Sequence, residues 1–285
     1  MPPNGFGAVM VIDTETNTAD YTTLTLSNTS PGFAMFAGAV ATNSKVFAIP
    51  NIATNFLIID PFTMTMDETS VAGLPSGGKY WGGVVSSTGL IVTTAAGSTS
   101  DAFGILDPAS LTFDTTSLYV GADGNKFSQG ALGNDGLIYF FPTTRSHVAI
   151  VNAEARTVDI TTITGFDDSI SSKWVYGTAA LGGSVLIGAP NNVQDALLIY
   201  PDSQTYELLP LGAQKYYNGC LEARNNKVMC FGTDTVAIVD VVAKSVDTTT
   251  LTGFTGSSYE GAVRATNGKL YRTPSQSDNV MIISY

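Results

Sequence analysis

Four lysines of this chain recur at the first position of a short motif that also holds an aromatic residue and a glycine. They are Lys79, Lys126, Lys173 and Lys215. Because ammonium groups attract carboxylates and sulfates, a rim built from these lysines would suit an anionic ligand such as an acidic glycan. The alternative is that each lysine covers a neighbouring aromatic ring or caps a strand. This alternative is favoured, because repeats copy their consensus residues whether or not those residues bind a ligand.

Aromatic residues are common at the two positions that follow these lysines. The first position holds Tyr80, Phe127, Trp174 and Tyr216, and the second holds Phe36, Trp81, Ser128, Val175, Tyr217 and Tyr259. Regular recurrence at the first position predicts packing between repeats. Side chains at the second position point to the opposite face of a strand. Trp81 is therefore a candidate for stacking on a sugar ring, although packing is the favoured interpretation there too.

The position before the repeat glycine differs most between the copies. It holds Ala37, Gly82, Gln129, Tyr176, Asn218 and Glu260. A position that varies while its neighbours repeat is a candidate for individual tasks. We therefore predict that its polar members and Tyr176 bind ligand, together with Trp81 and the four lysines. Oxygen atoms of Gln129, Asn218 and Glu260 could hold calcium, but one carboxylate is few for tight binding. We expect no metal or cofactor, with calcium as the alternative.

Catalytic chemistry has few candidate residues. His147 is the single histidine, two positions after Arg145, and is expected to be a solvent-facing loop residue. No serine lies in a nucleophile-elbow pattern, so we predict no catalytic residues. Lyase chemistry needs only one base, however, and a site that combines His147 with Glu260 stays open.

The two cysteines, Cys220 and Cys230, flank a turn predicted at Asn225-Asn226. They would lie nearly opposite each other on paired strands, where disulfide geometry is often strained. We expect two small buried hydrophobic residues, with a disulfide as the alternative.

These residues are positioned by a unit of four predicted strands, seen clearly in residues 126–165. The strands cover residues 127–133, 137–141, 147–151 and 157–163, and Asp135-Gly136 is typical of a type I′ hairpin turn. Thr and Ile alternate in the fourth strand, as expected of a half-exposed edge. Six such copies, about 45 residues apart, predict an all-β, six-bladed β-propeller of four-stranded antiparallel blades.

In their overall pattern the repeats resemble those of kelch-like and YVTN-like propellers. The third strand of the first copy, for example, reads Phe56-Leu57-Ile58-Ile59-Asp60-Pro61. The resemblance covers the whole chain, is architectural, and carries no catalytic residues with it. Six-bladed lactonase-like propellers use Glu and Asn in their channel, and this analogy implies the calcium alternative. We predict one domain over residues 1–285, with blades at approximately 31–73, 76–119, 123–166, 170–211, 213–253, and 257–285 plus 6–27.

The two ends of the chain are expected to meet in the last blade. The chain stops after a third strand, residues 279–285, and the N-terminal strand at residues 18–26 would complete that blade as its fourth strand. Such closure removes free sheet edges. Residues 8–13 then form a surplus strand, which could lie at a blade edge, start a rudimentary seventh blade, or join a neighbouring copy by self-assembly.

Composition excludes several classes of function. The formal net charge of −11 disfavours nucleic-acid binding. No run of apolar residues is long enough to span a membrane, and the first residues lack the pattern of a secretory signal peptide. The low charged fraction of 13% and the many threonines are typical of extracellular, cell-surface or virion proteins.

We expect a non-enzymatic binding or structural module that presents a protein- or glycan-binding face around the central channel. The alternatives are a lactonase-like or lyase-like small-molecule enzyme with a channel-centred site, or a subunit of a larger assembly. Whether any catalysis occurs stays open at this point.

Overall fold

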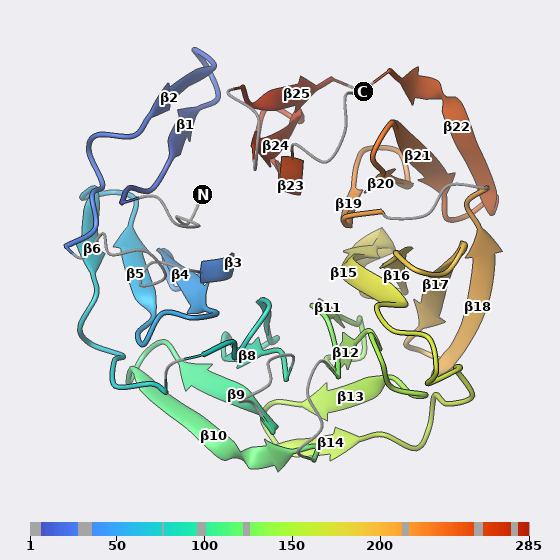
Figure 1. Ribbon diagram of the computed structural model, residues 1–285, viewed down its shortest axis with the longest axis horizontal. Helices are drawn as coiled ribbons and strands as arrows, with labels where there is room; N and C mark the ends of the chain where they lie inside the picture. Colours follow the sequence, from blue (N-terminus) through green and yellow to red (C-terminus); the bar gives the residue numbers. More distant parts are fainter. Residues whose placement is uncertain are drawn as a thin grey trace. The chain divides into compact units, whose positions relative to one another are not determined.

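The computed structural model describes residues 7–27, 36–75, 77–95, 101–121, 126–212, 217–253, 259–274 and 279–284. These residues form antiparallel sheets, and the fold is an all-β, six-bladed β-propeller, which confirms the prediction from the repeats (Figure 1). Across the described ranges the one helical segment is the 3₁₀ turn Leu181–Gly183 (η1). No helix among them is long and apolar enough to cross a membrane.

Each of the first five blades is a sheet whose four strands pair in chain order. The first blade contains β3 (Phe36–Thr42), β4 (Lys45–Pro50), β5 (Leu57–Asp60) and β6 (Thr65–Asp67). The second contains β7 (Gly83–Val85), β8 (Ile91–Thr93), β9 (Ala102–Asp107) and β10 (Thr112–Tyr119). The third contains β11 (Ala131–Leu132), β12 (Ile138–Phe140), β13 (Ala149–Asn152) and β14 (Thr157–Asp159). The fourth contains β15 (Trp174–Ala180), β16 (Val185–Pro190), β17 (Asp195–Tyr200) and β18 (Thr205–Pro210). The fifth contains β19 (Cys220–Glu222), β20 (Lys227–Phe231), β21 (Thr235–Asp240) and β22 (Ser245–Thr252).

The strands at the two ends of the chain form smaller sheets. The sixth blade contains β23 (Tyr259–Arg264), β24 (Leu270–Pro274) and β25 (Met281–Ile283), which form a three-stranded sheet. At the N-terminus β1 (Val11–Asp13) and β2 (Thr18–Asp20) pair with each other in a two-stranded sheet. The expected surplus strand is thus β1, and it takes β2 as its partner because the chain turns back at residues 14–17. Closure of the sixth blade by residues 18–26 stays a prediction.

The chain divides into two compact units. Unit 1 comprises residues 1–129 and 151–158, and unit 2 comprises residues 130–150 and 159–285. The first two blades belong to unit 1 and the last three to unit 2. The single domain predicted for residues 1–285 stays a prediction.

Hydrophobic side chains of neighbouring blades pack together inside each unit. In unit 1, Phe47 and Phe56 of the first blade share a cluster with Tyr80 and Leu106 of the second. In unit 2, one cluster joins the third and fourth blades and another joins the fourth and fifth. The second strand of the fourth blade is buried throughout, whereas the fourth strand, β18, is largely exposed. This difference explains why middle strands are continuous hydrophobic runs and outer strands are rich in threonine.

The turns between the first two strands differ from blade to blade. Gly136 is in the left-handed region with a φ of 81°, and its N–H donates to the Gly133 carbonyl. The φ of Asp135 is not positive, whereas a type I′ turn needs positive φ at both central residues. This turn is therefore a type I turn followed by a left-handed glycine, and the predicted type I′ turn is wrong here. The fifth blade uses the type I′ form instead, because Asn225 and Asn226 both have positive φ.

An Asp-x-Thr-Ser/Thr motif begins in the fourth strands of the first, second, third and fifth blades and in β2. Its aspartates are Asp20, Asp67, Asp114, Asp159 and Asp247. The Asp67 carboxylate accepts hydrogen bonds from the backbone N–H groups of Thr69 and Ser70, at 2.8 and 3.0 Å, and from both hydroxyls. It therefore binds N–H groups that an edge strand would otherwise expose. Burial raises the pKa of Asp67, but the hydrogen bonds from Ser70 and Thr69 outweigh it and lower the pKa to about 2.

We predict that Asp67→Ala lowers the free energy of unfolding at pH 7 by about 1–2 kcal/mol. Because the folded state holds the pKa of Asp67 at about 2, the contribution is complete above the ordinary pKa of 3.8 and is lost as the pH falls toward 2. Urea unfolding of the variant and of an exposed control, Asp234→Ala, at pH 7 and pH 2.5 measures this. An equal loss for Asp67→Ala at both pH values would contradict the carboxylate's role.

Cys220 and Cys230 form a disulfide. They are directly paired residues of β19 and β20, with their Cα atoms 4.0 Å apart, and both lie in the cluster between the fourth and fifth blades. The expectation of two free buried thiols is therefore wrong. The turn at residues 225–226 brings the two cysteines face to face at a directly opposed position of the hairpin, which is close enough for the bond.

Replacing both cysteines by alanine is expected to lower the free energy of unfolding by about 2–3 kcal/mol, since the bond closes a short loop in the unfolded chain. Denaturant unfolding of the variant measures the loss. Alkylation without reduction, followed by mass spectrometry, should leave both cysteines of the natural chain unmodified. Labelling of either cysteine in the folded protein would refute the bond.

Candidate ligand-binding site

The repeated lysines in the described ranges are buried side chains that bind backbone carbonyls or lie beside a carboxylate. Lys79 is 2% exposed, and its ammonium donates to the carbonyls of Pro75 at 2.6 Å and Gly77 at 3.1 Å. Lys173 is 1% exposed and donates to the Ile170 carbonyl at 3.0 Å. Burial lowers the pKa of both ammonium groups.

Lys126 is also fully buried, and its ammonium lies 3.9 Å from the carboxylate of Asp101. Lys215 lies outside the described residues. The three described lysines thus do not present the exposed cationic rim that the sequence suggested. They fit the alternative, in which a lysine caps the chain that leads into each blade, because its charge satisfies carbonyls beside the first strand. Ligand binding by these lysines stays a prediction.

Three of the four aromatic residues that directly follow the lysines are part of the core, and the fourth, Tyr216, lies outside the described residues. Tyr80, Phe127 and Trp174 are 4%, 0% and 3% exposed. Tyr80 packs edge-on against Phe113, and Trp174 packs against Phe166 at a centroid distance of 5.0 Å. Trp81, at the next position, is half-buried. Its backbone N–H donates to the Thr94 hydroxyl at 2.7 Å.

The variable position lies where the first strand bends. The register of the fourth blade shifts between Val175 and Thr178, and Tyr176 there has a φ of 41°. Such bulges re-aim a side chain and are frequent beside functional sites. A Cβ atom at Gly219 would lie 3.2 Å from the Cβ of Tyr176, so the two copies meet closely at this point.

The described contacts do not test whether the three residues proposed as oxygen ligands lie together. Gln129 lies in unit 1, with its Oε1 3.0 Å from where a Cβ of Gly82 would be. Asn218 lies in unit 2 and is half-buried. The side chain of Glu260 is outside the described part of the structure. Within the described ranges no group of three or more His, Cys, Asp or Glu residues could hold a metal ion. The calcium alternative therefore stays untested.

The fifth copy is displaced by one residue relative to the sequence alignment. Gly82 and Gly219 have φ values of 135° and 132°. The Thr94 N–H donates to the Gly82 carbonyl, and the Phe231 N–H donates to the Gly219 carbonyl. Gly219 thus corresponds to Gly82, and Tyr217, which is fully buried, takes the place of Tyr80 in the fifth blade.

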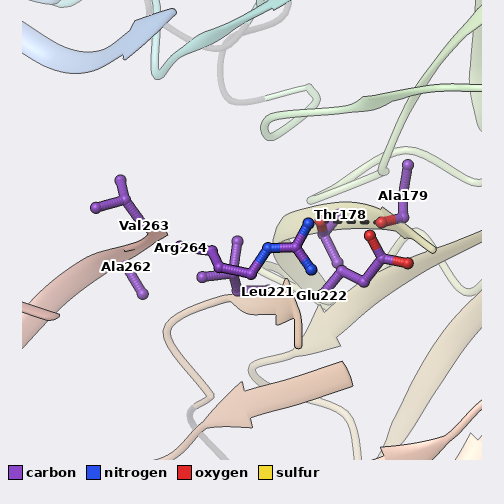
Figure 2. Close-up of a pocket in the computed structure, with 7 residues that line it drawn as sticks. All are labelled: Thr178, Ala179, Leu221, Glu222, Ala262, Val263 and Arg264. Atoms are coloured by element: carbon purple, nitrogen blue, oxygen red, sulfur yellow. Dashed lines mark hydrogen bonds between the residues drawn. The ribbon is translucent and has the colours of Figure 1, made fainter. Parts of the chain in front are cut away.

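A hollow of about 350 Å³ opens on the first strands of the last three blades in unit 2 (Figure 2). We call it the inner hollow, and its lining residues are Thr178, Ala179, Leu221, Glu222, Ala262, Val263 and Arg264. They come from β15, β19 and β23, and β19 contacts both of the other strands. The volume is at the lower end of the range typical of small-molecule sites.

Two opposite charges lie in the inner hollow. Glu222 Oε1 accepts a hydrogen bond from the Leu181 N–H at 3.0 Å, and Arg264 Nη1 donates to the Ala223 carbonyl at 3.0 Å. Each charged group is therefore held by the backbone of the preceding blade. Figure 2 shows the guanidinium of Arg264 pointing toward Glu222 and Thr178. A carboxylate and a guanidinium in one hollow can bind a hydrogen-bond donor and an anion side by side.

Sequence reasoning did not select Glu222 or Arg264, although a signal was present. At the third position after the repeat glycine the first four copies carry Ala41, Ser86, Gly133 and Ala180. The last two copies carry Glu222 and Arg264 there. Small residues in four copies and charges in two are the same kind of disagreement that singled out the position before the glycine.

His147 is not among the residues that line the inner hollow. It forms an isolated antiparallel bridge with Thr164 and is half-buried rather than solvent-facing. Burial, and then the charge of Arg145, lower the pKa of His147, which favours the neutral imidazole. Catalysis by His147 stays a prediction.

The chain is similar in fold to several solved structures. Virginiamycin B lyase from Staphylococcus aureus matches with a TM-score of 0.73 and 12% identity, covering 94% of this chain and 85% of that chain. Streptogramin B lyase matches with a TM-score of 0.65 and 13% identity over 90% of this chain and 85% of that chain. The extracellular domain of a one-component system from B. thetaiotaomicron matches with a TM-score of 0.68 and 6% identity over 98% of this chain and 38% of that chain.

No protein-family model matches the chain, and no curated protein sequence matches it. At such low identities the structural matches establish the propeller fold alone. Enzymes and an extracellular domain both use this fold, so the fold by itself does not decide between catalysis and binding.

We expect Lys79→Met to lower the free energy of unfolding by about 2 kcal/mol, because the Pro75 and Gly77 carbonyls lose a charged donor. Lys45→Met, at an exposed lysine, should change it by less than about 0.5 kcal/mol. Chemical denaturation measures both. Equal effects of the two substitutions would contradict a structural role for the buried ammonium.

Proposed function

We propose that this protein is a non-enzymatic binding module whose ligand, part of a protein or a glycan, contacts the first strands of its blades. The inner hollow receives the ligand's polar group. Glu222 and Arg264 bind that group, and Leu221 and Val263 contact its apolar part.

The observation that carries this proposal is the placement of two divergent charges in one hollow. In the other four blades the strand pairing puts apolar residues at this place, namely Ala41, Val85, Leu132 and Ala180. The charges are therefore not needed to build a blade. A backbone group of a neighbouring blade orients each of them, which lowers the cost of ordering a side chain when a ligand binds. Loops and strand ends on a rigid scaffold are a common place for such sites.

Two observations support an extracellular or cell-surface location. The Cys220–Cys230 disulfide is the kind of bond that persists in oxidising compartments. One protein of similar fold is an extracellular domain. A fold stabilised by buried hydrophobic clusters and a disulfide is also suited to conditions outside the cell.

The test is to screen labelled protein on a glycan array and a short-peptide array, and then to measure the Kd of the strongest ligand for four variants. We expect Glu222→Gln and Arg264→Gln to weaken binding at least about tenfold, since each loses a charge-assisted hydrogen bond. The charge-matched controls Glu15→Gln and Arg156→Gln, both in unit 1, should bind as the natural chain does.

Circular dichroism verifies that each variant is folded. Unchanged binding in Glu222→Gln and Arg264→Gln, with loss in Trp81→Ala, would move the site to the half-buried tryptophan and contradict the proposal. Conversion of the captured ligand into a product would contradict the non-enzymatic part and support the lyase-like or lactonase-like alternative.

A further inference from the structure

The ligand chemistry of the inner hollow follows from how its two charges are satisfied. Glu222 uses one carboxylate oxygen for the Leu181 N–H, and Arg264 uses Nη1 for the Ala223 carbonyl. Among contacts of the described residues, the second oxygen of Glu222 and the other N–H groups of Arg264 have no protein partner, and the two side chains form no ion pair with each other. Both signs of charge therefore remain available to a ligand.

The rest of the inner hollow is suited to a small apolar group. Leu221, Ala262 and Val263 contribute aliphatic surface, and Val263 is 58% exposed, which is high for a valine. The Thr178 hydroxyl donates to the Ala179 carbonyl at 3.3 Å, so its oxygen keeps a lone pair for a ligand donor. At about 350 Å³ the hollow has room for a small molecule or for one end of a chain.

The charge of the whole protein decides between ligand classes. With a formal net charge of −11, the protein repels polyanions such as acidic glycans and nucleic acids. A ligand that carries one positive and one negative group has no net charge to be repelled. It also satisfies both Glu222 and Arg264, whereas an anion alone would leave the carboxylate facing a like charge.

We infer that the inner hollow recognises a zwitterion that carries an ammonium group, a carboxylate and an aliphatic side chain. The ammonium group donates to Glu222, the carboxylate accepts from Arg264, and the side chain contacts Leu221 and Val263. A free amino acid and a short peptide share this chemistry. The inference rests on the proposed function and specifies the ligand class for the same site.

Isothermal titration calorimetry of the full chain with four probes tests this inference. The probes are leucine, N-acetyl-leucine, which lacks the ammonium group, leucinamide, which lacks the carboxylate, and the dipeptide Leu-Leu. We expect leucine or Leu-Leu to bind, and each blocked form to bind at least about tenfold more weakly. A tighter Kd for leucine assigns the site to free amino acids, and a tighter Kd for Leu-Leu assigns it to peptides.

The variants connect each probe to one side chain. Glu222→Gln should weaken leucine binding about tenfold but leave N-acetyl-leucine unchanged, because that probe has already lost the interaction. Arg264→Gln should likewise weaken leucine binding about tenfold but leave leucinamide binding unchanged, because leucinamide lacks the carboxylate that Arg264 binds. Glu15→Gln and Arg156→Gln serve as charge-matched controls, and thermal melting confirms that every variant is folded.

Two outcomes would overturn the inference. Equal affinity for leucine and its blocked forms would show that the protein does not recognise the two charges of the ligand. If none of the four probes gives a heat of binding at millimolar concentration, no such zwitterion binds. If the array ligand still depends on Glu222 and Arg264 in either case, the binding site stands and only the ligand class is wrong. If neither ligand depends on them, the proposed function fails as well.

Discussion

Packing between neighbouring blades is the interaction on which the rest of this structure depends. A four-stranded sheet of this size cannot bury two hydrophobic faces by itself, so each blade needs the next one to cover its middle strands. Within unit 1, Phe47 and Phe56 of the first blade meet Tyr80 of the second; within unit 2, Leu198 of the fourth blade meets Val228 of the fifth. The motif residues that recur most faithfully serve these interfaces. The recurring motif residues of this chain therefore build the interfaces between blades.

The buried lysines are residues of a type common in binding sites, but in this protein they have a structural role. The ammonium group of Lys79 replaces solvent for carbonyls that would otherwise be buried without a donor, which is costly in a protein interior. The aspartates of the outer motif perform the complementary task, since Asp67 and its equivalents accept N–H groups at exposed edges. Lysine ammonium groups thus bind backbone carbonyls before the first strand of a blade, and aspartate carboxylates bind backbone N–H groups at its fourth strand. Their regular spacing is a consequence of that need.

The fold could be predicted from the sequence because hydrophobic periodicity and turn residues recur six times and reinforce one another. Local geometry could not, for three physical reasons. A bulge at Tyr176 and a one-residue displacement in the fifth copy change which side chain faces inward without changing the residue types. The Cys220–Cys230 bond depends on direct pairing across a type I′ turn, which spacing alone leaves undecided. Glu222 and Arg264 become neighbours only when β19 and β23 lie side by side.

In the proposed function the divergent charges Glu222 and Arg264, and not the repeated lysines, bind the ligand. A crystal structure of the protein soaked with its strongest array ligand tests this most directly. We expect electron density in the inner hollow, with ligand atoms within hydrogen-bond distance of the Glu222 carboxylate and the Arg264 guanidinium. Ligand density beside Lys79 or Trp81, with the inner hollow filled by water alone, would contradict it.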